Sequence, residues 1–308
     1  MQKISIAIHG GAGTILKNEL NPALEKKYLA GLKNAISEGY LLLKSGGTST
    51  NAVQLAVTIL EDNPLFNAGK GAVFSYNGNH EMDAAIMEGL NLNAGGVCGV
   101  SKIKNPISLA RLVMDKSEHV LLSGKGAEDF ATLMNCKTEA DSYFYDELRY
   151  KQWQRIKNTN HFQLDHSSKK TDKFGTVGAV ALDSFGNLAA ATSTGGMTNK
   201  KFGRVGDSPV IGAGNYANNK TCAISCTGSG EFFLRGVVAY DVSCHIEMKG
   251  LSLKSACQEV IHNRIKSLGG DGGLIAVDTK GQIAMPFNTE GMYRASIDYL
   301  GKETIEIY

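Results

Sequence analysis

The sequence predicts a layered α/β protein. Short apolar runs separated by turn residues, the pattern of β-strands, dominate the part after residue 175. Residues 22–44 and 253–268 instead carry apolar side chains at helical spacing. A final pair of strands, 274–277 and 282–286, surrounds a turn and completes the pattern. With 308 residues, 43% of them hydrophobic, the chain can bury a large core in one domain or two modest ones.

The first half alternates strands and helices. Asn51 and its neighbours Ser49 and Thr50 can cap the second helix, and Pro64 ends it. In order, we expect a strand over residues 4–8, a glycine turn over 9–13, helices over about 22–44 and 49–63, a glycine-bearing loop over 65–71, and strands over 72–74 and 82–87.

Residues 137–175 differ from their surroundings because charged side chains interrupt every apolar run. This composition predicts a polar linker between two parts of the chain. The aromatic residues Tyr143, Phe144, Tyr150 and Trp153 could pack locally, so a solvated helix and loop within this stretch is equally compatible with the pattern.

The second half is richer in strands. A turn over residues 184–187 separates the first two of them. In order, we expect strands over 176–182, 188–194 and 221–227, a helix beginning after Gly230 that carries Phe233, Val237 and Tyr240, the helix over 253–268, and the closing hairpin.

Charge and hydropathy exclude several classes of function. The net charge is +2, and the 32 basic and 30 acidic residues are spread along the chain, so no basic stripe indicates a nucleic-acid partner. No apolar run approaches the roughly 18 residues of a membrane span. The N-terminus enters a strand pattern directly, and we therefore expect a cytoplasmic protein.

Cofactor motifs are also missing from the sequence. The six cysteines form no CxxC pair, and the histidines lack metal-ligand spacing, so we expect no transition-metal site. The GKG segments at 69–71 and 124–126 lack the Ser or Thr that a phosphate-binding P-loop requires, and no GxGxxG follows a strand. This argues against a nucleotide-binding protein and for a protein without an organic cofactor.

Thr176 occupies an abrupt junction between the charged stretch and an apolar strand. A threonine hydroxyl is a weak nucleophile on its own. An N-terminal threonine, however, carries its own base, the α-amine, whose pKa of about 8 suits neutral pH. Cleavage between Gly175 and Thr176 would create that amine.

Two further threonines, Thr194 and Thr227, stand beside glycines at the ends of predicted strands. Glycine lets a substrate approach the backbone and leaves amide N–H groups free to hold an oxyanion, and Thr227 with Gly228 could form such a hole. Each pattern alone is weak evidence, because threonine favours strands and glycine favours turns.

Arg204 and Asp207 supply opposite charges three residues apart in a turn-rich loop. This pair suits the zwitterionic end of an amino acid. The alternative is a surface ion pair of small energetic value. His9, which closes the first strand, is expected to make structural hydrogen bonds and is given no catalytic role.

Taken together, these motifs make the chain resemble the plant-type asparaginase family, which contains isoaspartyl peptidases/L-asparaginases and belongs to the N-terminal-nucleophile hydrolases. The matching stretches are residues 9–13 (HGGAG), 64–71 (PLFNAGKG), 175–183, 190–200, 203–209 (GRVGDSP), 226–231 (CTGSGE) and 286–293. The resemblance implies a four-layer αββα sandwich, made as one precursor. The precursor would cut itself into an α subunit, residues 1–175, and a β subunit, residues 176–308, that assemble as an (αβ)2 dimer of heterodimers.

The resemblance also implies roles for individual residues and a substrate class. Isoaspartyl dipeptides and L-asparagine would be hydrolysed to release L-aspartate. The implied roles are Thr176 as nucleophile, Thr194 as its hydrogen-bonding partner, Thr227 and Gly228 as the oxyanion hole, Arg204 for the substrate α-carboxylate, Asp207 and the Gly230 carbonyl for the α-ammonium, and Asn67 for the precursor or substrate side of the site.

A structural sodium ion is a further implication of the resemblance. Its expected ligands are backbone carbonyls, and oxygen-only ligation suits a hard cation. They would come from Leu60, Glu61, Asn63, Phe66, Ala68 and Lys70. From the residues alone, Glu61 and Asp62 look like a solvated helix end, because carbonyl ligands leave no side-chain pattern.

Two alternatives stay open from the sequence. A glycosylasparaginase would usually carry an acidic residue before its nucleophile and a secretory signal, whereas Gly175 precedes Thr176 and no signal is visible. A non-catalytic module could hold aspartate through Arg204 and Asp207 while the Gly175–Thr176 bond stays intact.

Overall fold

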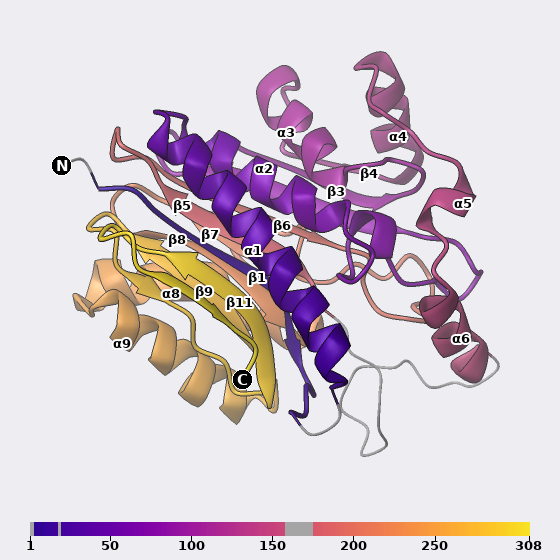
Figure 1. Ribbon diagram of the computed structural model, residues 1–308. Coiled ribbons are helices and arrows are strands. Elements are labelled where there is room, and N and C mark those ends of the chain that lie inside the picture. The colour runs from indigo at the N-terminus through magenta and orange to yellow at the C-terminus, as the bar shows by residue number, and fades with distance from the viewer. Residues whose placement is uncertain (1–2, 18–19, 158–174) are drawn as a thin grey trace.

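The structure, a computed structural model, describes residues 3–17, 20–157 and 175–308. Two sheets are stacked face to face, and helices cover the outer face of each (Figure 1). The larger sheet has the strand order β12-β11-β1-β5-β6-β2-β3-β4, and the smaller has the order β10-β9-β8-β7. This is the αββα sandwich that the family resemblance implies.

All elements follow one another with short connections over most of the chain. The strands are β1 Ser5–Gly13, β2 Met82–Glu88, β3 Ala94–Val100, β4 Leu121–Ser123, β5 Val177–Leu182, β6 Leu188–Thr194, β7 Asn215–Ala217, β8 Cys222–Gly228, β9 Gly272–Asp278, β10 Ile283–Ala284, β11 Gly291–Ile297 and β12 Glu303–Glu306. The helices are α1 Pro22–Lys44, α2 Ser49–Glu61, the 3-10 turn η1 Gly69–Gly71, α3 Pro106–Lys116, α4 Gly124–Leu133, α5 Asp141–Phe144, α6 Glu147–Ile156, α7 Gly230–Gly236, α8 Val238–Lys249, α9 Leu253–Gln258 and the π-helical η2 Glu259–Ile265.

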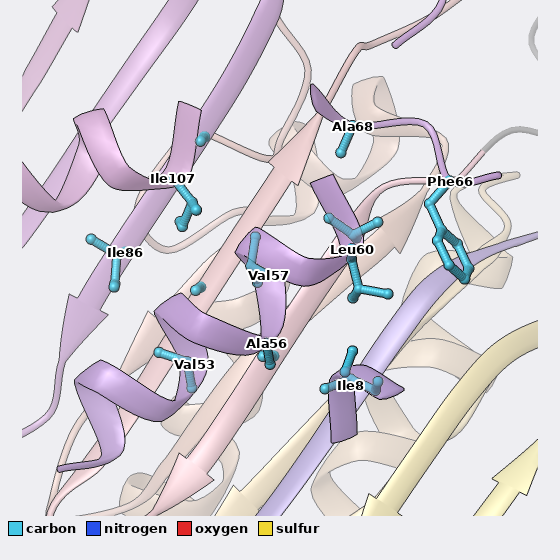
Figure 2. Packing of buried hydrophobic residues seen from close by; sticks show 14 of the residues in the cluster. Ile8, Val53, Ala56, Val57, Leu60, Phe66, Ala68, Ile86 and Ile107 are labelled. Atoms are coloured by element: carbon cyan, nitrogen blue, oxygen red, sulfur yellow. The ribbon is translucent and has the colours of Figure 1, made fainter. Parts of the chain in front are cut away.

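Helices α1 and α2 form the layer over the large sheet (Figure 1). The Asn21 side chain accepts the Ala23 N–H and begins α1, as its position before Pro22 favours. Helix α2 presents apolar side chains at helical spacing to the sheet, among them Val53, Val57 and Leu60, which Figure 2 shows packed near Ile8 of β1. Burial of these side chains fixes α2, and with it the loop that follows residue 61, over the sheet.

Strand β5 lies at the centre of the large sheet, between β1 and β6. Its side chains alternate between the two faces. Val177 and Ala179 join the core beneath the helices, whereas Val180 and Leu182 join the core between the two sheets. Because both faces are covered, the strand is a continuous apolar run in the sequence.

The smaller sheet is covered on its outer face by α7, α8, α9 and η2. Residues of β8 and β9, including Ile224 and Leu274, pack against Val242 and Ile261 of these helices. Opposite residues of the same strands, such as Ile275, face the large sheet. The predicted helix after Gly230 is in fact two helices, because Val237 adopts a left-handed conformation with φ +48° between α7 and α8.

Three predictions for the first half need correction. Residues 9–13, expected as a turn, continue β1, because a bulge between His9 and Gly11 lets the strand keep its pairing with β11. Residues 72–74 form no strand and follow the turn η1. The charged stretch expected as a linker contains α5 and α6, whose Phe144 and Trp153 are buried, so its ordered part packs on the protein.

The rest of the predicted linker, residues 158–174, lies outside the described residues. Among the residues that the structure does describe, no helix is long and apolar enough to cross a membrane.

Candidate active site

One pocket gathers the residues singled out from the sequence. Antiparallel pairing of β5 with β6 places Val177 opposite Ser193, so the residue before β5 and the end of β6 meet at one edge of the large sheet. Strand β8 packs against both strands from the other sheet, and its end reaches the same place. The pocket is lined by Ala12, Gly13, Asn67, Gly175, Thr176, Thr194, Gly196, Met197, Arg204, Gly206, Asp207, Ser208, Thr227, Gly228, Ser229, Gly230, Asp271 and Thr289.

The Thr176 hydroxyl lies within a small network of hydroxyl groups. Its Oγ1 donates to Thr194 Oγ1 at 3.2 Å, and it lies 3.4 Å from Ser208 Oγ. Thr194 Oγ1 also accepts the Gly196 N–H at 3.0 Å. Thr194 is therefore held in place by the loop after β6 and orients the Thr176 hydroxyl, as the sequence prediction requires.

Gly175 precedes Thr176 in the pocket and packs tightly against backbone. A Cβ atom at Gly175 would lie 2.3 Å from the carbonyl oxygen of Gly10. Only glycine fits here. The peptide bond that the sequence nominates for cleavage is thus fixed between the glycine segment of β1 and the Thr176 hydroxyl.

Thr227 and Gly228 end β8 on the opposite wall of the pocket. Thr227 Oγ1 accepts the Ala12 N–H at 3.2 Å, which leaves its own hydroxyl proton available for donation. Gly228 has φ +154°, and a Cβ atom there would lie 2.4 Å from the Asp271 carbonyl oxygen. Glycine is required for this turn, and a hydroxyl donor and an unobstructed backbone stand side by side.

Arg204 and Asp207 form a charged end of the pocket. Glu231 of α7 receives two hydrogen bonds from Arg204, each 2.8 Å, from Nε and Nη2. Burial alone would raise the pKa of Glu231, but the hydrogen bonds and charge of Arg204 lower it. This bidentate contact fixes the plane of the guanidinium group.

Asp207 is almost fully buried, and its Oδ2 atom has no hydrogen-bond partner. Burial raises the pKa of this carboxyl to about 7 despite the nearby charge of Arg204. A Cβ atom at Gly230 would lie 2.7 Å from Arg204 Nη2 and 3.1 Å from Asp207 Oδ1, so Gly230 stands between the two charges. The pocket wall therefore offers an anion site, a cation site and no side chain between them.

Asn67 also lines the pocket, but its polar atoms are used within the protein. Its Nδ2 donates to the Gly196 carbonyl at 2.8 Å, and its Oδ1 accepts the Val73 N–H at 3.1 Å. Asn67 thereby joins the loop after α2 to the loop that carries Thr194.

Comparisons with known proteins agree with this site. The model of a family described as asparaginase matches residues 1–307. The chain belongs to this family. It is 50% identical to an isoaspartyl peptidase from Salmonella typhimurium over 96% of this chain and 95% of the relative. It is 42% identical to an isoaspartyl peptidase/L-asparaginase from Xenopus laevis over 95% of this chain and 91% of the relative. It is 43% identical to a plant-type L-asparaginase from Pyrococcus abyssi over 94% of each.

Sequence reasoning about this asparaginase-family chain missed several pocket residues. Ser208 follows Asp207 directly, and Glu231 ends a quoted motif, yet neither stood out because loop residues have no periodic pattern. Lys200 and Asp83 form a buried pair behind the pocket, with Lys200 Nζ 3.9 Å from Asp83 Oδ2 and 2.6 Å from the Glu81 carbonyl oxygen. Burial raises the pKa of Asp83, which Lys200 partly offsets.

The loop predicted to hold sodium in this asparaginase-family chain turns several carbonyl groups inward. A Cβ atom at Gly71 would lie 2.1 Å from the Phe66 carbonyl oxygen, and one at Gly69, where φ is +52°, would lie 2.6 Å from that of Glu61. Among the described residues there is no cluster of three or more His, Cys, Asp or Glu side chains that could bind a metal. An oxygen-only donor set from carbonyls fits a hard monovalent cation.

Proposed function

We propose that this chain is a self-cleaving hydrolase that releases L-aspartate from isoaspartyl dipeptides and from L-asparagine. One observation carries the proposal: a threonine hydroxyl that directly follows a tightly held glycine faces a pocket with both an arginine and an unpartnered aspartate oxygen. The names of the relatives, isoaspartyl peptidase and L-asparaginase, support the same substrates.

Maturation begins with Thr176 Oγ1 attacking the Gly175 carbonyl carbon. The peptide nitrogen then leaves as the α-amine of Thr176, and an ester joins Gly175 to the Thr176 hydroxyl oxygen. Water hydrolyses this ester and releases the Gly175 carboxylate together with a free N-terminal threonine. The product is an α subunit of residues 1–175 and a β subunit of residues 176–308.

Substrate binding uses the charged end of the mature site. Arg204 binds the α-carboxylate, and Asp207 with the Gly230 carbonyl binds the α-ammonium. The unpartnered Oδ2 atom of Asp207 supports this assignment, because an ammonium donor would satisfy it. The β-carbonyl of the substrate then lies toward Thr176.

The Thr176 amine takes the proton of Oγ1 as this oxygen attacks the β-carbonyl carbon. The tetrahedral oxyanion accepts hydrogen bonds from Thr227 Oγ1–H and the Gly228 N–H, each donor contributing about 3 kcal/mol. The amine returns its proton to the leaving nitrogen, so ammonia or an amino acid departs. Water, deprotonated by the same amine, hydrolyses the β-aspartyl ester and frees aspartate.

Two further features belong to the proposal. A sodium ion bound by carbonyls of Leu60, Glu61, Asn63, Phe66, Ala68 and Lys70 would fix the loop that carries Asn67, a purely structural contribution. The mature αβ units would associate as an (αβ)2 dimer.

The first test is the intact mass of the purified protein under denaturing conditions, before and after prolonged incubation. We expect two fragments, one ending at Gly175 and one beginning at Thr176, together with release of aspartate from an isoaspartyl dipeptide. The variant Thr176→Ala should remain one chain and be inactive, whereas Thr176→Ser, which keeps a hydroxyl, should still mature. A wild-type chain that stays uncut yet binds aspartate would favour the non-catalytic module instead.

The glycosylasparaginase alternative is tested by a second substrate. Turnover of N-acetylglucosaminyl-asparagine faster than that of isoaspartyl dipeptides would replace the proposed specificity. Gly175 before the nucleophile, and relatives named for isoaspartyl substrates, support the lower rate that we expect.

A further inference from the structure

His9 of β1 contacts the nucleophile residue without facing the pocket. Its Nδ1 atom lies 2.9 Å from the Thr176 carbonyl oxygen, and its Nε2 atom lies 2.9 Å from Ser225 Oγ of β8. His9 and Ser225 are both fully buried. The imidazole therefore connects the large sheet, the small sheet and the residue that bears the nucleophile.

The partners of His9 determine which ring nitrogen carries the proton. A carbonyl oxygen can only accept, so Nδ1 must be the protonated nitrogen. Burial lowers the pKa of His9 to about 3, so the ring is neutral and Nε2 must accept. Ser225 then donates to Nε2 and itself lies 2.7 Å from Thr192 Oγ1, which can donate to it. The hydrogen bonds run in one direction, from Thr192 through Ser225 and His9 to Thr176.

Gly178 leaves the space that this arrangement needs. It pairs with His9 across β1 and β5. A Cβ atom at Gly178 would lie 2.0 Å from Ser225 Oγ and 2.4 Å from His9 Nε2. Any other residue at position 178 would push these two groups apart.

We propose that His9 is a positioning residue that, as the Nδ1–H tautomer, holds the Thr176 carbonyl and keeps the nucleophile aimed after the chain is cut. The inference rests on the proposed function. Cleavage turns Thr176 into a chain end, and chain ends are poorly ordered unless they are tied down. The strand β5 begins only at Val177, so the His9 hydrogen bond is the printed contact that holds the Thr176 backbone itself. The Thr176 carbonyl belongs to the bond that cleavage leaves intact, and the anchor therefore survives maturation.

The first experiment needs no turnover. In the 15N NMR spectrum of the wild-type protein, assigned with the variant His9→Gln, His9 should show a protonated Nδ1 and an unprotonated Nε2, unchanged from pH 6 to pH 8. An Nε2-protonated or doubly protonated His9 would overturn the proposal. This result is independent of activity, so an inactive protein with the expected tautomer would defeat the proposed function and not the hydrogen-bond arrangement.

The second experiment separates the two ring nitrogens. Asparagine places its amide near the Nδ1 position and can still donate to Thr176, whereas glutamine reaches the Nε2 position and keeps only the Ser225 contact. In mature enzyme, we expect His9→Gln to lower kcat tenfold or more, as about 1 Å of misplacement does, with KM changed less than about twofold. His9→Asn should retain kcat within about threefold, because the donor to Thr176 is kept.

A matched control is His80, a second buried histidine whose Nδ1 atom contacts a carbonyl oxygen, that of Ala72 at 3.0 Å. His80→Gln should leave kcat within about twofold, because it touches no pocket residue of the proposed site. Equal losses in His9→Asn and His9→Gln, or a loss confined to KM, would show that His9 only packs and would overturn the proposal.

Discussion

Gly11 and Gly175 approach so closely that a Cβ atom on Gly11 would lie 2.2 Å from the Cα atom of Gly175. Gly11 also has φ +112°, a conformation that side chains other than glycine rarely adopt. The contact fixes the residue whose carbonyl carbon Thr176 is proposed to attack. It therefore links a glycine near the N-terminus to the chemistry at the middle of the chain.

The variant Gly11→Ala should slow self-cleavage strongly, because the methyl group must displace Gly175 from the Thr176 hydroxyl. The time course of the two fragments by intact mass measures this. Gly46→Ala is the matched control: Gly46 has φ +89° but no atom within 4 Å of an added Cβ, so it carries the backbone strain without the clash. Equal cleavage rates for both alanine variants would contradict the role of the glycine contact.

Thr227→Val should lower kcat about 100-fold with little change in KM, because it removes one oxyanion donor and keeps the shape of the side chain. Thr227→Ser keeps the hydroxyl and should retain most activity. Steady-state kinetics on an isoaspartyl dipeptide decide the matter. If valine and serine variants are equally active, the hydroxyl is not an oxyanion donor.

Asp207 should make substrate binding depend on pH. Burial raises its pKa to about 7, so the carboxyl becomes neutral as pH falls below that value and can no longer attract an ammonium group. We expect kcat/KM to fall about tenfold per pH unit well below pH 7, since this ratio reports the free enzyme. The same profile for Asp207→Asn should lose this step and keep only the ionisation of the Thr176 amine. A step that persists in the asparagine variant belongs to another group.

Arg204→Lys should raise KM by about tenfold or more, although it keeps the positive charge. Lysine cannot reproduce the two hydrogen bonds to Glu231, each 2.8 Å, that fix the guanidinium plane. The kinetics of the lysine variant with isoaspartyl dipeptide and with L-asparagine provide the check. An unchanged KM for both would mean that Arg204 does not bind the substrate α-carboxylate.

Removal of sodium should lower the thermal stability of the mature enzyme, because an ion bound only by the folded state stabilises that state. Unfolding is compared in buffers whose only monovalent cation is choline, with sodium chloride or choline chloride added at equal ionic strength. Recovery of the midpoint with sodium alone supports the site. Identical midpoints in the two salts would remove it from the proposal.

The sequence predicted the regular part of the fold well, and its local departures poorly. Helix α1 begins where Asn21 and Pro22 predict, and β5 and β6 occupy the expected runs, because capping and burial on two faces leave patterns in the sequence. The break at Val237 left no pattern, because a tertiary contact, and not a glycine, imposes its left-handed conformation.

The candidate site was predictable at strand ends and not in loops. Thr176, Thr194 and Thr227 stand at the ends of strands, and strand pairing and sheet stacking bring these ends together. Ser208 reaches Thr176 from a loop, and its position depends on how that loop folds back. Likewise, the tightness of the Gly10 and Gly175 contact becomes visible only in three dimensions.

The strand order of the large sheet has a consequence for the nicked protein. Strands from before residue 175 are β1 and the group β2, β3 and β4, and those from after it are the pairs β12 with β11 and β5 with β6. The two fragments are thus interleaved, each strand group lying beside groups of the other. A cut at Gly175 removes no pairing within the sheet, and the pieces cannot separate without breaking it at three seams. Dissociation of the fragments would be the same event as unfolding, so dilution alone should not inactivate the processed protein.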